Sequence, residues 1–205
     1  MIRNILFDMG QVLIRWDPPL FVSRLGLNAE DSTLLLREVY QGADWVMLDR
    51  GSVTEDALIA RVSARLPERL RGYVEGLVRH WDDPPLQIPD MEPLVRELRE
   101  KGYGVYLLSN AGLRHHDYWQ RFPVSRYFGD HVFISADHLL LKPDPSFYET
   151  ALRQFSLDRS ECVFIDDNSA NVEGALRCGL DAIVFFGDVP RLRRQLREKG
   201  VDIAE

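Results

Sequence analysis

Short runs of apolar residues recur along the chain and predict buried strands. The segment Ile2–Phe7 predicts a first strand that ends at Asp8, and Gly10 permits a sharp turn directly after it. Runs of the same kind recur at residues 105–108, 132–134, 162–165 and 182–186. Amphipathic stretches alternate with these later runs and predict helices. Alternation of strands and helices is typical of an α/β fold, a doubly wound, Rossmann-like parallel sheet with helices on both faces.

Polar residues mark where several of the helices should begin. Asp90 is expected to cap a helix that Gly102 ends, and Asp144 followed by Pro145 predicts another helix start. The last helix is expected at residues 189–199, which are rich in arginine. We interpret these arginines as a solvated helix face and not as a binding patch.

Residues 17–86 have a different pattern from the rest of the chain. Their apolar positions recur at helical spacing, no strand is predicted among them, and Pro84 and Pro85 end the block. This helical block follows the first strand directly. We therefore expect an α/β core of residues 1–16 and 87–205 and an inserted all-helical domain of residues 17–86.

Composition narrows the possible partners and location. The chain has 205 residues, of which 45% are hydrophobic and 28% charged, as in an ordinary globular protein. Its net charge of −7 argues against a nucleic-acid partner, and its first apolar run is too short for a signal peptide or membrane span. The two cysteines, Cys162 and Cys178, lie in apolar or helical contexts and are expected to be reduced. We expect a cytoplasmic protein that binds neither nucleic acid nor membrane.

Polar side chains follow three of the predicted strands. Asp8 ends the first, Ser109 and Asn110 end the second, and Asp166 and Asp167 end the run at 162–165. Ligands of open parallel sheets bind outside these strand ends. Each group alone could be a turn residue or a helix cap. Adjacent aspartates at a buried strand end, however, repel each other unless a cation compensates them.

The three strand ends together predict chemistry on a phosphate. Converging carboxylates suit Mg²⁺, which prefers oxygen ligands and often completes its shell with phosphate. An aspartate can attack phosphorus and form an aspartyl phosphate, provided that cations neutralise the two approaching anions. Lys142 is the candidate lysine, because it follows an apolar run and precedes Pro143 in an extended segment. The alternative is an ordinary solvated surface lysine.

Four segments carry a family resemblance: FDMGQVL at 7–13, LLSN at 107–110, LKPDP at 141–145 and FIDDN at 164–168. In order and spacing they resemble the four motifs of the haloacid dehalogenase-like (HAD) hydrolases, and the helical insertion looks like the cap of that superfamily. The resemblance covers nearly the whole chain. Within the superfamily, the chain looks most similar to small bacterial sugar-phosphate phosphatases, such as those acting on α-D-glucose 1-phosphate.

The resemblance implies a magnesium-dependent phosphatase that hydrolyses a small phosphorylated metabolite, with sugar phosphates among the candidates, through an aspartyl-phosphate intermediate. Asp8 would be the nucleophile. The implied metal ligands are Asp8, the backbone carbonyl of Gly10, Asp166 and Asp167, and the implied phosphoryl-binding residues are Ser109, Asn110 and Lys142. The sequence does not decide which of the two adjacent aspartates binds the metal directly. We expect a monomer or a weak dimer.

One position departs from the family pattern. Most phosphatases of the superfamily have an aspartate two residues after the nucleophile as general acid and base, where this chain has Gly10. Asp17 is a possible substitute, although it is also placed to cap a helix begun by Pro18. His115 and His116 could face the phosphate or the cap, and packing is the simpler interpretation.

Two other functions stay open. A 2-haloacid dehalogenase would use the same nucleophile on carbon without a metal, and the pair Asp166 and Asp167 disfavours it. A non-catalytic binding protein with the HAD fold is the second alternative, because Gly10 removes the usual proton donor.

Overall fold

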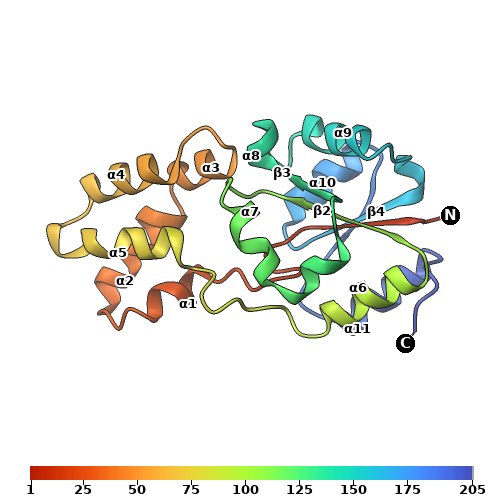
Figure 1. Ribbon diagram of the computed structural model, residues 1–205, viewed down its shortest axis with the longest axis horizontal. Coiled ribbons are helices and arrows are strands. Elements are labelled where there is room, and N and C mark those ends of the chain that lie inside the picture. Colours follow the sequence, from red (N-terminus) through yellow and green to blue (C-terminus); the bar gives the residue numbers. More distant parts are fainter. Residues whose placement is uncertain (205) are drawn as a thin grey trace.

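The computed structural model describes residues 1–204 and contains one five-stranded parallel sheet (Figure 1). Its strands, in chain order, are β1 (Asn4–Phe7), β2 (Gly104–Ser109), β3 (Val132–Ile134), β4 (Cys162–Asp166) and β5 (Asp181–Val184). They lie in the order β3-β2-β1-β4-β5, and every neighbouring pair is parallel. The predicted doubly wound α/β fold is confirmed.

The strand order places β1 at the centre of the sheet, where the connections diverge. From β1 the chain adds β2 and then β3 along one edge of the sheet. It then returns to the opposite side of β1, where β4 and β5 are added. In such sheets a crevice forms at the carboxyl ends of the strands beside this reversal. The residues that follow β1, β2 and β4 therefore share one edge.

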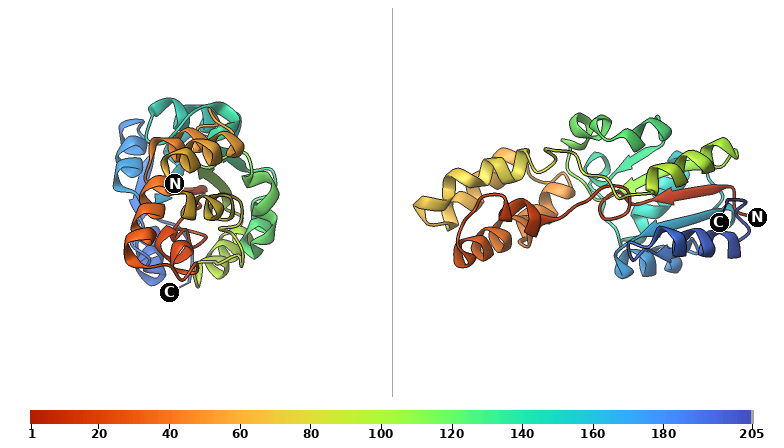
Figure 2. Two further views of the ribbon diagram at one scale, coloured as in Figure 1. Left: turned by 90° about the vertical axis from the view of Figure 1, so that its left-hand side faces the viewer. Right: turned by 90° about the horizontal axis from the view of Figure 1, so that it is seen from below.

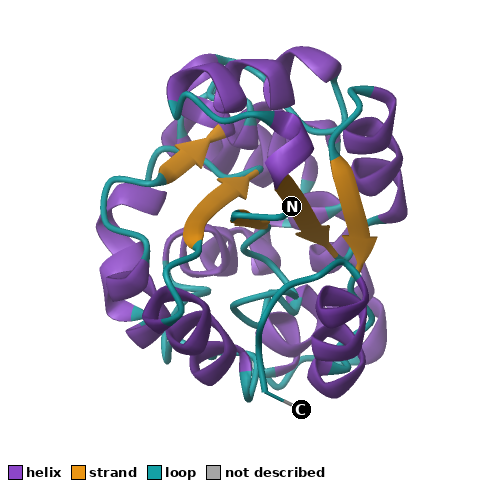
Figure 3. Cartoon of the chain, turned by 90° about the vertical axis from the view of Figure 1, so that its right-hand side faces the viewer, coloured by secondary structure: helices purple, strands orange, loops and turns teal. Residues whose placement is uncertain are grey.

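Helices cover both faces of the sheet (Figure 3). The core helices are α6 (Met91–Glu100), α7 (His115–Tyr118), α8 (Ser135–His138), α9 (Pro145–Gln154), α10 (Ser169–Arg177) and α11 (Val189–Glu198), with 3₁₀ turns η2 (Trp119–Arg121), η3 (Pro123–Tyr127) and η4 (Arg159–Glu161). Successive strand residues point to opposite faces. Ile5 and Phe7 accordingly belong to the apolar cluster that contains the buried residues of α6 and α11, whereas Leu6 packs with those of α9 and α10.

The insertion is entirely helical among its described residues. It comprises α1 (Pro18–Ser23), α2 (Ala29–Leu35), the π-helix η1 (Leu36–Tyr40), α3 (Ala43–Asp49), α4 (Glu55–Arg65) and α5 (Glu68–Arg79). Figure 2 shows these helices at one end of the molecule, beyond the carboxyl ends of the strands. Two linkers, one before α1 and one after α5, connect the insertion to the core. They run side by side, because Ile14 pairs with Gln87 and the Arg15 N–H donates to the Leu86 carbonyl. We call this insertion the cap and keep its boundaries, 17–86, as our assignment.

Two local expectations were wrong. Asp90 stands before α6 in a left-handed conformation with φ of 65°, and its side chain makes no capping hydrogen bond. The last strand ends at Val184, the final residue paired with β4, so Phe186 is exposed and not part of the strand. Asp144, in contrast, caps α9 as expected, since its side chain accepts from the Ser146 N–H at 2.9 Å.

Cys162 and Cys178 are both buried and free, which agrees with the expected reduced thiols. Within residues 1–204, no helix combines the length and the apolar character needed to cross a membrane.

Candidate active site

The parallel register brings the polar strand ends together. Phe7 pairs with Leu107 on one side and with Ile165 on the other, so Asp8 and Asp166 follow at the same level. Carboxylate oxygens of Asp8, Asp166 and Asp167 lie within 4.8 Å of one another. The three aspartates proposed from sequence therefore converge at one point.

Lys142 lies among these carboxylates and is almost completely buried. Its Nζ donates to Asp8 Oδ1 at 2.6 Å, to Asp166 Oδ2 at 2.7 Å and to the Leu108 carbonyl at 2.9 Å. These three contacts use all three N–H donors of an ammonium group. Burial by itself lowers the pKa of Lys142, but the charges of Asp166 and Asp8 raise it above its ordinary value. The lysine is therefore a fixed cation inside the site.

The backbone around Lys142 is held from two directions. The Asn110 side chain donates to the Lys142 carbonyl at 3.0 Å and accepts from the Lys142 N–H at 2.9 Å. On the other side α10 approaches so closely that a Cβ on Gly174 would stand 2.5 Å from the Pro143 carbonyl oxygen. Asn110, expected to hydrogen-bond a phosphoryl group, thus uses its side chain to position the lysine. Ser109 lines the cavity and is buried at the end of β2.

The two adjacent aspartates have different surroundings. Asp166 is fully buried, and it accepts hydrogen bonds from Lys142, from the Asn168 N–H at 2.8 Å and from Asn171 Nδ2 at 3.1 Å. Asp167 is exposed and lines the cavity. Asn171 was missed in the sequence, because nothing in the pattern of α10 distinguishes it from a solvent-facing asparagine.

The site carries more negative than positive charge. Burial raises the pKa of Asp8 to about 7, with Lys142 opposing the rise and the charges of Asp166 and Asp167 adding to it. Burial is also the main cause that raises the pKa of Asp167 to about 6. Three carboxylates face one ammonium, which leaves two negative charges when all are ionised. Clustered oxygen donors with this excess charge fit a hard divalent cation such as Mg²⁺.

A cavity of about 280 Å³ lies between the strand ends and the cap. Its core side presents the charged residues described above. Aromatic side chains also line the cavity: Trp16 between β1 and α1, Trp45 on α3, Trp81 after α5 and Tyr118 on α7. The ring centroids of Trp16 and Trp81 are 4.6 Å apart and those of Trp16 and Trp45 are 5.1 Å apart. The cavity therefore combines charged and aromatic side chains.

Arg114 joins the cap to the core beside this aromatic wall. It donates to Glu55 at 2.8 Å and to Asp82 at 2.9 Å, and its guanidinium lies 5.0 Å from the centroid of the Tyr118 ring. Asp82 is buried and also pairs with Arg121 at 2.5 Å. Glu55 and Asp82 are thus held by arginines of the core.

Asp17, the substitute proton donor considered from sequence, caps α1. Its side chain accepts from the Leu20 N–H at 3.0 Å and pairs with Arg15 at 2.8 Å. Slight burial acts to raise the pKa of Asp17, but these hydrogen bonds lower it below its ordinary value. Asp17 does not line the cavity. The helix-cap interpretation is therefore correct.

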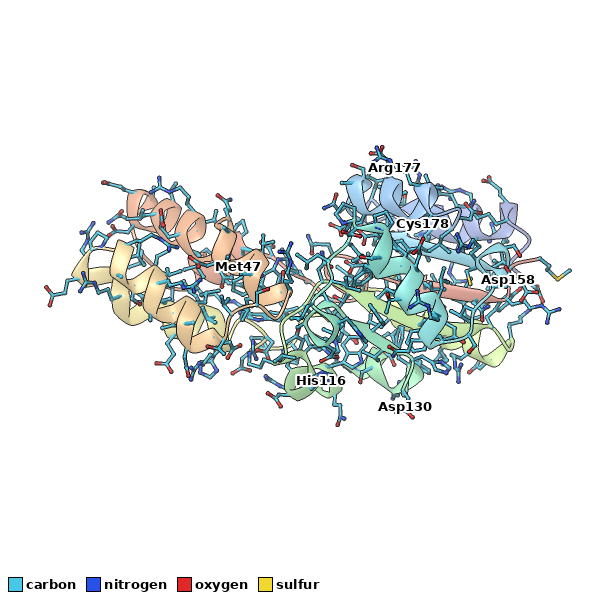
Figure 4. The ribbon with its side chains drawn as sticks, turned by 90° about the horizontal axis from the view of Figure 1, so that it is seen from above. Met47, His116, Asp130, Asp158, Arg177 and Cys178 are labelled. Carbon is cyan, nitrogen blue, oxygen red and sulfur yellow. The ribbon has the colours of Figure 1, made fainter. Side chains whose placement is uncertain are left out.

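The paired histidines also have structural surroundings. His115 is buried with its ring 5.4 Å from that of Trp119, and burial lowers its pKa to about 3. His116 points outward at the edge of the molecule, where it contacts Asp137 at 3.0 Å (Figure 4). Both histidines pack against protein and not into the cavity.

Comparison with known proteins agrees with this geometry. The family description "haloacid dehalogenase-like hydrolase" matches residues 2–179. A sesquiterpene phosphatase of Aspergillus oryzae is 29% identical over 184 residues, which cover 85% of each chain.

Similar folds are found among solved structures. A HAD family enzyme from Bacteroides thetaiotaomicron, in complex with magnesium and inorganic phosphate, shares 23% identity with a TM-score of 0.69, covering 94% of this chain and 99% of that one. A dehalogenase shares 19% identity with a TM-score of 0.70, covering 90% of this chain and 85% of that one. These two likenesses concern the fold alone. Because the family match spans most of the sequence, the chain belongs to the haloacid dehalogenase-like hydrolases.

Proposed function

We propose that this hydrolase is a magnesium-dependent phosphatase that cleaves a small phosphate monoester through an aspartyl phosphate on Asp8. The observation that carries the proposal is the charge of the site, where Asp8, Asp166 and Asp167 face the single cation of Lys142. A dehalogenase that works without a metal would leave two negative charges uncompensated. A non-catalytic protein would have no use for a buried lysine held between two carboxylates.

The residues assigned to the metal are Asp8, Asp167 and the backbone carbonyl of Gly10. Asp166 is better suited to an outer position, since its oxygens already accept from Lys142, Asn168 and Asn171. When bound, Mg²⁺ supplies positive charge that offsets the nucleophile and the phosphoryl oxygens. Asp166 then acts by fixing Lys142.

Each side chain of the site has a distinct role in phosphoryl transfer. Lys142 holds the Asp8 carboxylate in one orientation, and Asp8 attacks phosphorus while the bond to the ester oxygen breaks. The Ser109 hydroxyl donates to a phosphoryl oxygen, and Asn110 keeps the lysine in place. Water then attacks phosphorus, which releases inorganic phosphate and restores Asp8.

We infer that the organic group of the substrate is apolar or planar. Four aromatic residues, Trp16, Trp45, Trp81 and Tyr118, line the same cavity as Asp8. A sugar needs hydrogen-bond partners for several hydroxyls, yet Glu55 and Arg114, which also line the cavity, are paired with each other. The similarity to a sesquiterpene phosphatase supports an apolar group over the sugar considered from sequence. We place the reaction in the cytoplasm, where two buried thiols stay reduced.

A substrate panel tests this proposal. The purified protein is given a terpenoid monophosphate, a sugar phosphate, p-nitrophenyl phosphate and 2-chloropropionate, each with Mg²⁺ and with EDTA. We expect phosphate release only with Mg²⁺, fastest from the terpenoid ester, and poor replacement by Ca²⁺ because it takes more ligands at longer distances. Halide release in EDTA would establish the dehalogenase, and no turnover in any condition would favour the binding protein.

A further inference from the structure

Phosphate ester cleavage needs a proton for the departing oxygen, and the core side of this site does not offer one. Position 10 is a glycine, and Asp17 is committed to Arg15 and the start of α1. Lys142 donates all its protons to fixed acceptors. Asp8 is assigned as the nucleophile, and Asp8 and Asp167 are both assigned as metal ligands, so neither is available as the proton donor. A donor must therefore come from elsewhere in the cavity.

Four other titratable side chains line the cavity: Asp49, Glu55, Arg114 and Tyr118. Glu55 and Arg114 form an ion pair, and Arg79 also contacts Glu55 at 3.7 Å. Burial raises the pKa of Tyr118 above its ordinary value, which makes it a weaker acid. Two of the four are carboxyl groups, Asp49 and Glu55. Among the described residues, Glu55 has arginine partners and Asp49 forms no ion pair.

The fold holds Asp49 in place at the junction of cap and core. It is the last residue of α3, the cap helix that contacts α8 (Figure 1). The Asp49 carbonyl accepts from Ser135 Oγ, and the same hydroxyl accepts from the Ala111 N–H at 2.9 Å. A Cβ on Gly51 would stand 2.5 Å from the Ala136 carbonyl oxygen, so the chain after α3 lies directly on the core.

The surroundings of the Asp49 side chain favour its protonated form. Burial and the negative charge of Asp8 raise the pKa of Asp49 well above its ordinary range. The charge of Lys142 and a hydrogen bond from Trp45, four residues earlier on α3, oppose this rise. A carboxyl group whose protonated form is favoured in this way is suited to act as a general acid.

We propose that Asp49 is the general acid and base of this active site, supplied by the cap in place of a side chain at position 10. This assignment rests on the phosphatase proposed above. As the bond from phosphorus to the ester oxygen breaks and the bond from Asp8 forms, the Asp49 proton passes to that oxygen and an alcohol leaves. The Asp49 carboxylate then takes a proton from the water that attacks phosphorus. The bond to Asp8 breaks, phosphate leaves, and Asp49 is protonated again.

The test compares leaving groups in Asp49→Asn. Asparagine keeps the shape of the side chain but can neither donate this proton nor accept one from water. In rapid-mixing experiments, phosphorylation of Asp8 by an alkyl phosphate should fall ~10²–10⁴-fold, the usual contribution of a general acid. Phosphorylation by p-nitrophenyl phosphate should stay within about tenfold of the parent, because nitrophenolate leaves without a proton. Since the variant also lacks its base, a burst of nitrophenolate should precede slow steady turnover.

Asp44→Asn is the matched control, since Asp44 lies on the same helix and pairs with Arg61 and Arg65 on α4. It should change both substrates by the same factor and show no new burst. Equal losses for the two leaving groups in Asp49→Asn, or the absence of a burst, would overturn the role of Asp49. Failure of the phosphatase proposal looks different, because the parent itself would then hydrolyse no phosphate ester.

Discussion

The cavity has two kinds of lining, charged side chains at the strand ends and aromatic side chains, and they are held in place in different ways. On the core side, Lys142, Asp8 and Asp166 are joined by short buried hydrogen bonds, and their positions follow from strand ends and a loop fixed by Gly174. Elsewhere the cavity is lined by an aromatic wall of Trp45 and Trp81 from the cap, Trp16 from the first linker and Tyr118 from α7, and ion pairs of Arg114 connect the cap to the core. The core thus has one arrangement suited to a phosphoryl group, whereas the cap shapes the space for the rest of the substrate. Changes among the charged residues at the strand ends should affect all substrates alike, and changes in the aromatic wall should discriminate among them.

Lys142→Ala should have the largest effect, and it should be the same for every ester. The substitution removes the cation between Asp8 and Asp166, and we expect a loss in kcat of about 10³-fold or more. Lys142→Arg should not restore the rate, because a planar guanidinium cannot reproduce the three contacts of an ammonium. Lys101→Ala, at an exposed lysine paired with Asp202, is the control. A loss of less than tenfold, or one that depends on the ester, would contradict the division between core and cap.

Magnesium affinity should depend steeply on pH. The pKa values of Asp8 and Asp167 are raised to about 7 and about 6, so both groups bind protons in the range where ordinary aspartates are ionised. Protons compete with the metal, and the apparent Kd should therefore rise roughly 10²-fold from pH 8 to pH 5.5, as measured by calorimetry.

The folded protein also binds these protons more tightly than the unfolded chain does. Stability of the metal-free protein should consequently fall as pH rises from about 4 to about 7. A pH-independent Kd would exclude Asp8 and Asp167 as ligands.

Gly174→Ala tests whether the backbone behind Lys142 positions it. The added methyl would meet the Pro143 carbonyl oxygen, so the loop must move, and we expect a loss of about tenfold in kcat for all esters. The free energy of unfolding should fall by about 1–3 kcal/mol. Gly76→Ala on α5 is the matched control, since nothing lies within 4 Å of its Cβ, and it should stabilise the protein by about 0.5–1 kcal/mol. Unchanged kinetics in Gly174→Ala would show that the close approach does not position the lysine.

Trp16→Leu should give the smallest effect and the clearest substrate dependence. Trp16 lines the cavity beside Trp45 and Trp81, and an aromatic contact with an apolar or planar substrate group would contribute about 0.5–1.5 kcal/mol. This corresponds to a fall of roughly 2–10-fold in kcat/KM for a terpenoid monophosphate. Acetyl phosphate, which carries only a methyl group for the rings to contact, should be affected much less. Phe186→Leu, at an exposed residue outside the cavity, is the control. Equal losses for both substrates would mean that the wall does not select the organic group.

The sequence predicted the core side of the site better than the cap side, for a physical reason. Apolar runs mark strands, and parallel pairing brings their ends together, so Asp8, Asp166 and Asp167 could be placed together in advance. Asp49 could not be placed, because its position depends on the docking of α3 against Ser135 and not on any local pattern.

Two smaller features could not be read from the sequence. Asp90 has the residue type of a helix cap but adopts a left-handed backbone, which no single-residue preference reveals. Asn110 was predicted to hydrogen-bond a phosphoryl group, which stays a prediction, and its side chain was not expected to pair with the Lys142 backbone. The conformation of Asp90 depends on its backbone, and the pairing of the Asn110 side chain depends on a partner 32 residues away in the sequence.

Direct detection of the covalent intermediate tests the central claim. The protein, with Mg²⁺ and p-nitrophenyl phosphate, is quenched in acid during turnover, and its peptides are weighed by mass spectrometry. We predict a transient gain of one phosphoryl group on the peptide that contains Asp8, lost when the substrate is exhausted before the quench and absent in Asp8→Asn, which should also be inactive. A phosphoryl group on another residue, or phosphate release by Asp8→Asn within tenfold of the parent, would contradict the account.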